Sequence, residues 1–220
     1  LAALLAFPLS VLSALFIVRI APPQLRTPMT TVVEVLAAIP SVVYGVFAAG
    51  SIASWVESLA SLFGITTYGG NSGLTAVILL MLMIYPTMTS LSVTAIEAVP
   101  PSLEQASLAL GASETQTNFK VILPAAKSGI MAGLVLGLGR AFGEATAVSM
   151  VSGNAMTGPS WNPFDITRTL TSTILAGLKE TTGLDYDVRF SVGIVLMIVI
   201  LFFNTLIQRA KKRIGGNVDE

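Results

Sequence analysis

Apolar runs long enough to cross a membrane recur along this chain, separated by short polar turns. A hydrocarbon core needs about 20 apolar residues in one helix. Four such runs cover approximately residues 1–18, 74–95, 122–152 and 190–207. A further apolar region, 29–63, exceeds one crossing and is interrupted at Pro40 and Gly45, which predicts an interfacial helix followed by a spanning helix. The pattern therefore predicts five membrane spans in an all-α, polytopic helical bundle.

The composition agrees with a membrane protein and excludes several classes of enzyme. The chain is 53% hydrophobic and 11% charged, whereas a soluble domain carries about 25% charged residues. Its formal net charge is zero, so nucleic acid is not an expected partner. Cysteine and histidine are both missing from the sequence, which removes disulfides, imidazole zinc sites and histidine-based triads. We therefore expect no catalytic activity in this chain.

Lysine and arginine residues beside the spans predict the orientation. They lie on one side if five spans alternate: Arg19, Arg26, Lys120, Lys127, Lys211, Lys212 and Arg213. The positive-inside rule makes that side the cytoplasm, with the C-terminus there as well. The segment 153–189 then lies outside the membrane on the other face. Leu1 would also lie outside, so we expect a sixth span upstream.

The loop at 99–124, between the third and fourth spans, predicts two short helices. Two capping boxes, in which a serine precedes a glutamine by three positions, are Ser102 with Gln105 and Ser113 with Gln116. Gly111 stands where the first helix should end, and the second helix should run toward Pro124. Such a cytoplasmic hairpin exposes an apolar edge that needs a partner.

The same loop resembles the EAA loop of ABC importer permeases. The stretch "QASLALG" is followed by nine residues and "VILP". The positions that match are Ala106, Gly111, Leu123 and Pro124, while Gln105 stands where the family has glutamate and Glu104 comes one place earlier. The resemblance implies that the loop docks into a groove on a cytoplasmic ATP-hydrolysing subunit and transmits its closure. The alternative is a capped surface hairpin without a partner.

Two opposite charges, Arg140 and Glu144, stand in the apolar fourth span. At about 100° per residue they share one helical stripe with three glycines at four-residue spacing, and these are Gly129, Gly133 and Gly137. The glycines predict a close helix packing seam. An arginine at mid-membrane costs about 2.5 to 3.5 kcal/mol on insertion scales, so it should face the protein.

The charge pair has two interpretations, which are compatible with each other. In the first, Arg140 and Glu144 form a salt bridge that locks two helices. In the second, Arg140 lines a path for an anionic substrate, because a guanidinium suits oxyanions, and Glu144 holds Arg140 when the path is empty. Tyr44 follows the break at Pro40, where an interrupted helix can meet an anion, although packing is the simpler role.

Three stretches extend the resemblance to a narrower family. "GLGRAFGEATAVSMVSGN", "VEVLAAIPSVVYG" and "APPQLR" resemble the PstC family of phosphate-importer permeases, and the similarity runs from Leu1 to about Arg213. This implies the type I ABC importer permease fold, a place in the bacterial inner membrane, and a role for Arg140 and Glu144 in passing phosphate. It also implies partners: a PstA-like sister permease, two cytoplasmic ATP-binding subunits, and an extracytoplasmic phosphate-binding protein.

The sequence holds no glycine-rich phosphate loop ending in Gly-Lys-Ser/Thr, so ATP and magnesium should bind to a partner chain and no cofactor to this one. We expect one permease domain, 1–213, and a polar tail, 214–220. The alternatives are a permease for sulfate, molybdate or phosphonate, and a non-transporting membrane scaffold. An intramembrane hydrolase would need a nucleophile with a base, or two membrane aspartates, and the spans lack both.

Overall fold

The computed structural model describes residues 1–156, 158, 160–177 and 182–214. Every named element in this part is helical, and two isolated β-bridges make no strand. Five helices of the described part are long and apolar enough to cross a membrane, which confirms the all-α class and the number of spans. They cover Ala2–Ile20, Ser41–Leu62, Gly73–Glu97, Glu114–Gly143 and Leu184–Arg209.

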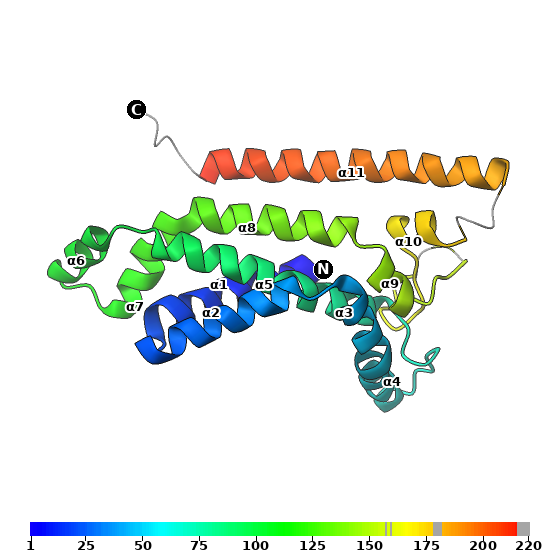
Figure 1. Cartoon of the computed structure of the whole chain (residues 1–220), viewed down its shortest axis with the longest axis horizontal. Helices are drawn as coiled ribbons and strands as arrows, with labels where there is room; N and C mark the ends of the chain where they lie inside the picture. The colour runs from blue at the N-terminus through cyan, green and yellow to red at the C-terminus, as the bar shows by residue number, and fades with distance from the viewer. Residues whose placement is uncertain (157, 159, 178–181, 215–220) are drawn as a thin grey trace. The chain divides into compact units, whose positions relative to one another are not determined.

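Figure 1 shows the helices in their order along the chain. In the first half of the chain they are α1 (Ala2–Leu15) with its π-helical extension η1 (Phe16–Ile20), α2 (Pro23–Ala38), α3 (Ser41–Phe47), η2 (Ala48–Ile52), α4 (Ala53–Leu62) and α5 (Gly73–Glu97). In the second half they are α6 (Pro101–Ala109), α7 (Glu114–Thr117), η3 (Asn118–Ile122), α8 (Leu123–Gly143), α9 (Thr146–Val151), α10 (Leu170–Leu175) and α11 (Leu184–Ile214).

Two boundaries within the predicted spans differ from the sequence pattern. The break at Pro40 is confirmed, since Pro40 is extended and caps α3. Gly45 does not interrupt the helix, because it lies buried inside α3. The prediction of one continuous helix over 122–152 is wrong: α8 ends at Gly143, and α9 starts at Thr146 after two non-helical residues.

The chain divides into two compact units. The first unit comprises Leu1–Ala2, Ile39–Met83 and Gly139–Phe203; the second comprises Ala3–Ala38, Ile84–Leu138 and Asn204–Glu220. Of the predicted tail, 215–220 lies outside the described residues, as do 157, 159 and 178–181 of the segment 153–189. The side chains of 211–213 are likewise outside the described part.

The second unit packs α1, α2, α5 and α8 around one apolar core. Its buried residues are Ala14, Leu15, Ile17, Val33, Val93, Ile96, Ile122, Ala126 and Ile130. The glycines of α8 face α5 here. A Cβ on Gly129 would lie 2.5 Å from the Cβ of Ala95, and one on Gly137 would lie 2.4 Å from the Cε of Met88. The two helices therefore approach more closely than any larger residue at these positions permits.

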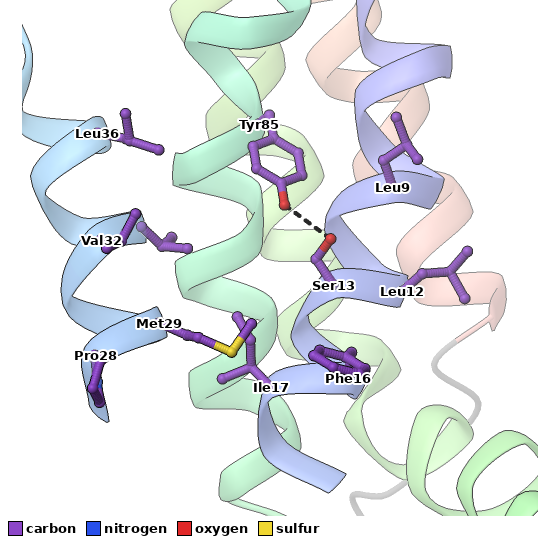
Figure 2. Close-up of a pocket in the computed structure, with 11 residues that line it drawn as sticks. Leu9, Leu12, Ser13, Phe16, Ile17, Pro28, Met29, Val32, Leu36 and Tyr85 are labelled. Carbon is purple, nitrogen blue, oxygen red and sulfur yellow. Dashed lines mark hydrogen bonds between the residues drawn. The ribbon is translucent and has the colours of Figure 1, made fainter. Parts of the chain in front are cut away.

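An apolar groove of about 540 Å³ lies in the second unit between α1, α2 and α5. Figure 2 shows leucine, valine and methionine side chains around it, with the hydroxyl of Tyr85 pointing toward Ser13. The Tyr85 hydroxyl donates to the Oγ of Ser13 at 2.9 Å. This hydrogen bond reduces the free-energy cost of placing both hydroxyl groups among apolar side chains.

The first unit has a separate core made by η2, α4, α5 and α9. Its buried residues are Ala48, Ile52, Val56, Ala76, Leu79, Ala147, Val148 and Val151. Gly45 of α3 packs against α9, since a Cβ there would lie 3.0 Å from the Cα of Ala147 and 2.7 Å from the Sδ of Met150. A glycine at this position lets α3 and α9 come into contact.

Alanine substitutions at the glycines of α8 should show which neighbouring side chains on α5 can move aside and which cannot. At Gly129→Ala the new methyl meets the Cβ of Ala95, which can move only with the backbone, whereas at Gly137→Ala it meets mainly the flexible end of Met88. We expect Gly129→Ala to lower the free energy of unfolding by about 1 to 3 kcal/mol and Gly137→Ala by less. Thermal unfolding of the purified protein in detergent measures both.

Gly139→Ala serves as the control, because a Cβ there meets nothing within 4 Å. Equal losses of stability at Gly129 and Gly137 would contradict the distinction between the two neighbours.

Candidate functional site

Arg140 lies in the last turn of α8 and is half-buried. The sequence placed it in the middle of a longer helix, and that expectation is wrong because α8 ends at Gly143. A cation in the last turn is favoured by the negative end of the helix dipole. The charge of Arg140 acts electrostatically on the phenol group of Tyr44, which belongs to α3 of the same unit.

Glu144 is the first residue after α8, so the predicted stripe along one continuous helix does not extend to it. Its Oε1 accepts a hydrogen bond from the backbone N–H of Ala147 at 2.8 Å, inside the first turn of α9. Its own carbonyl accepts a bond from the Oγ1 of Thr171 at 2.8 Å. Glu144 thus joins the end of α8, the start of α9 and the start of α10.

Tyr44 and Thr171 interact with the two charged residues in ways that the sequence does not indicate. The sequence shows Tyr44 only as a residue after a helix break, and no motif marks Thr171. Thr171 follows Thr169, which forms a capping box with Ser172 at the start of α10. That box is readable from the sequence as a helix start, but it does not indicate that Thr171 reaches Glu144.

The loop at 99–124 contains the two predicted short helices, with one start that differs. The box at Ser113 and Gln116 is confirmed in full. The box at Ser102 is wrong: the N-cap lies two residues earlier, at Pro100, α6 begins at Pro101, and there is no side-chain cap. A proline fits the first helical position because its missing N–H has no partner there in any case, so the proline pair determines the start.

Gly111 follows the C-terminus of α6 with φ +84°, which confirms that it ends the helix. Pro124 does not end the second helix. Instead α7, η3 and α8 form one helical run from Glu114 to Gly143, and the N–H of Leu123 bonds to the carbonyl of Asn118 in a π-type turn. This wider turn lies immediately before Pro124, where a proline disturbs ordinary helical bonding.

The surface of α6 is open. None of its residues is buried, and its apolar side chains Leu103 and Leu108 are 42% and 40% exposed. Gln105 and Ala106 are exposed as well, whereas Glu104 is partly buried and contacts Arg19. An open apolar helix of this kind matches the expectation that the loop needs a partner.

Side-chain contacts join the two helices of the loop to each other and join the loop to η1. The Oγ of Ser107 and the Oγ1 of Thr117 are 2.9 Å apart, which ties α6 to α7. Arg19, at the end of the first span, contacts Glu104 and Asn118. In the described part of the chain there is no group of three acidic, histidine or cysteine residues that could hold a metal ion.

Residues 6–215 match the family described as the binding-protein-dependent transport system inner membrane component. The chain belongs to this family. It is 39% identical over 215 residues to the probable ABC transporter permease protein YqgH of Bacillus subtilis (strain 168), with 97% of this chain and 68% of that protein covered. It is 32% identical over 234 residues to the phosphate transport system permease protein PstC of Pasteurella multocida (strain Pm70), with 98% and 72% covered.

Solved structures agree on the fold. Inward-facing MetNI methionine ABC transporter has a TM-score of 0.67 at 17% identity, with 97% of this chain and 89% of that chain covered. A bacterial alginate ABC transporter has a TM-score of 0.64 at 17% identity, with 97% and 74% covered. The resemblance to PstC permeases is thereby confirmed by the relatives, and the fold by the structures.

Family membership places the chain among multi-pass inner membrane proteins. It is a permease component of a binding-protein-dependent ABC importer and is not itself the catalyst, since ATP is hydrolysed by separate subunits in such systems.

Removing the carboxylate of Glu144 should destabilise the start of α9. Glu144→Ala leaves the N–H of Ala147 without its side-chain acceptor, and loss of such a cap costs about 0.5 to 2 kcal/mol. Glu144→Gln keeps an oxygen acceptor and should stay close to the wild type. Thermal unfolding in detergent compares the two, and equal stability of Glu144→Ala and the wild type would contradict the capping role.

Proposed function

We propose that this chain is the membrane-spanning permease subunit of an ATP-driven importer of inorganic phosphate. The proposal is supported by the relatives named PstC, which match this chain over nearly its whole length. The observation that carries the substrate class is the half-buried guanidinium of Arg140 in the last turn of α8, whose charge acts on the phenol of Tyr44. Both groups donate hydrogen bonds, and a guanidinium in particular suits a tetrahedral oxyanion.

In this proposal Arg140 binds phosphate as the anion passes, and Tyr44 offers a second donor. Phosphate replaces the water and the protein groups that otherwise stabilise the guanidinium. Glu144 has two tasks: its carboxylate caps α9, and its negative charge near the end of α8 keeps the anion from being held too tightly. An anion that binds too strongly would not leave the path.

Coupling to ATP belongs to the loop at 99–124. We infer that Gln105, Ala106 and Gly111 of the loop lie against a cytoplasmic ATP-binding subunit, with Leu123 and Pro124 at the start of α8. The open surface of α6 supports this docking role. Two ATP-binding subunits, a PstA-like sister permease and an extracytoplasmic phosphate-binding protein complete the proposed transporter, with ATP and magnesium held by the ATP-binding subunits.

Arg140→Gln should lower phosphate uptake by at least about tenfold, since the loss of a hydrogen bond to a charged group costs about 1.5 to 3 kcal/mol. The complex should still assemble and bind ATP. Uptake of labelled phosphate into vesicles that contain the complete transporter measures this. Arg209→Gln removes the same charge from an exposed position of α11 and should take up phosphate normally.

Normal uptake by Arg140→Gln would reject the role of Arg140. Competition by sulfate, molybdate or phosphonate in the same assay tests the substrate: phosphate should compete best, and a better competitor would replace phosphate in the proposal. If phosphate uptake is unchanged when the charges of Arg140 and Glu144 are removed, the chain acts as a scaffold.

Gly111→Val should uncouple transport from ATP hydrolysis. Valine is strongly disfavoured at a positive φ, and Gly111 has φ +84°, so the turn between α6 and α7 should rearrange. Gly111→Asn is the matched control, because asparagine tolerates this conformation. Uptake and ATP turnover are measured together; if both are unchanged in Gly111→Val, the docking role of the loop is wrong.

A further inference from the structure

Arg19 connects the first membrane helix with both halves of the loop at 99–124. It lies in η1, and its Nε donates a hydrogen bond to the Oδ1 of Asn118 at 3.0 Å. Its Nη2 donates to the Oε1 of Glu104 and forms an ion pair with that carboxylate. Glu104 belongs to α6 and Asn118 to η3. One guanidinium therefore bridges three helical segments of the second unit.

These contacts are partly shielded from solvent. The side chains of Arg19 and Glu104 are 24% and 29% exposed, and Asn118 is 9% exposed. Fully exposed ion pairs contribute little to stability, because solvent and salt screen them. Here the loss of one partner leaves the other charge partly desolvated, so the bridge is stronger than an ordinary surface pair.

Two of the three residues of the bridge lie in π-helical turns, and Glu104 lies in the α-helix α6. Arg19 is in η1, where the N–H of Ala21 bonds to the carbonyl of Phe16 at 2.8 Å. Asn118 opens η3, where the N–H of Leu123 bonds to the carbonyl of Asn118. A π-turn holds one extra residue and so changes the direction in which nearby side chains leave the helix; such turns are rare and concentrate at functional sites.

The loop itself is held as one piece by the hydroxyl pair of Ser107 and Thr117, 2.9 Å apart. Thr117 is almost fully buried and precedes Asn118. A force on α6 is therefore passed to η3 within the loop and to η1 through Arg19. Since Glu104 is engaged inside the chain, Gln105 is the neighbouring polar residue left exposed on α6.

We propose that Arg19, with Glu104 and Asn118, is the joint through which movement of the loop is passed to the first membrane helix. Arg19 is a positioning residue: it touches neither substrate nor nucleotide. The proposal rests on the proposed function in taking the loop as the contact to the ATP-binding subunit. The proposal assigns Glu104, which stands one place before the usual glutamate of the EAA pattern, to a contact within the chain.

The test compares single and reciprocal changes in the complete transporter reconstituted in vesicles. Arg19→Gln and Glu104→Gln each remove one charge of the pair, and Arg19→Glu with Glu104→Arg exchanges the two charges. The measured quantity is the ratio of phosphate taken up to ATP hydrolysed in the same vesicles. Arg209→Gln is the matched control, since it removes an exposed arginine of α11.

Each single change should lower the ratio by at least about fivefold, the lower end of usual coupling between sites, while ATP hydrolysis continues. The exchanged pair should recover most of the ratio, and Arg209→Gln should leave it unchanged. A merely structural role would reduce assembly and ATP hydrolysis without changing the ratio. If Arg19→Gln fails to assemble, the exchanged pair and Glu104→Gln still decide the question.

Single changes that leave the ratio at the wild-type value would overturn the joint, as would an exchanged pair no better than the single changes. A failure of the substrate proposal shows separately, because the wild-type transporter would then not take up phosphate. If the wild type transports a different oxyanion, the same ratio is measured with that anion.

Discussion

The end of α8 leaves backbone carbonyls, and the start of α9 leaves backbone amides, without a helical partner, and a membrane protein must satisfy such groups within the chain. Glu144 satisfies part of this need, because its carboxylate accepts from Ala147 and its carbonyl accepts from Thr171. These bonds fix α9 directly after α8. The position of α9 in turn fixes α3, which packs against it through Gly45. Tyr44, on whose phenol the charge of Arg140 acts, is the neighbour of Gly45 and is positioned with it.

The sequence predicts the parts of this protein that depend on local pattern. The five spans follow from runs of apolar residues, and the break at Pro40 follows from the geometry of proline. The second capping box and the turn at Gly111 are also local signals, and the structure confirms both. The capping box at Ser102 does not give the start of α6, because the two consecutive prolines upstream of Ser102 determine it.

The break after Gly143 was missed for a different reason. A glycine commonly marks a helix end, but the fourth span contains five glycines, and four of them lie inside α8 or face a neighbouring helix. The apolar pattern continues into α9, so the local sequence does not distinguish the glycine that ends the helix. The contact between Arg19 and Glu104 joins residues 85 positions apart, and no local pattern indicates such a pairing.

The two candidate sites are linked by covalent continuity through α8, whose helical run begins in the loop and has Arg140 in its last turn. The central claim is that the guanidinium of Arg140 meets the transported anion. A structure of the complete transporter with bound phosphate tests it most directly. We expect a phosphate oxygen about 3 Å from a nitrogen of Arg140; an Arg140 that faces lipid, or lies in dry packing away from the phosphate, would refute this role.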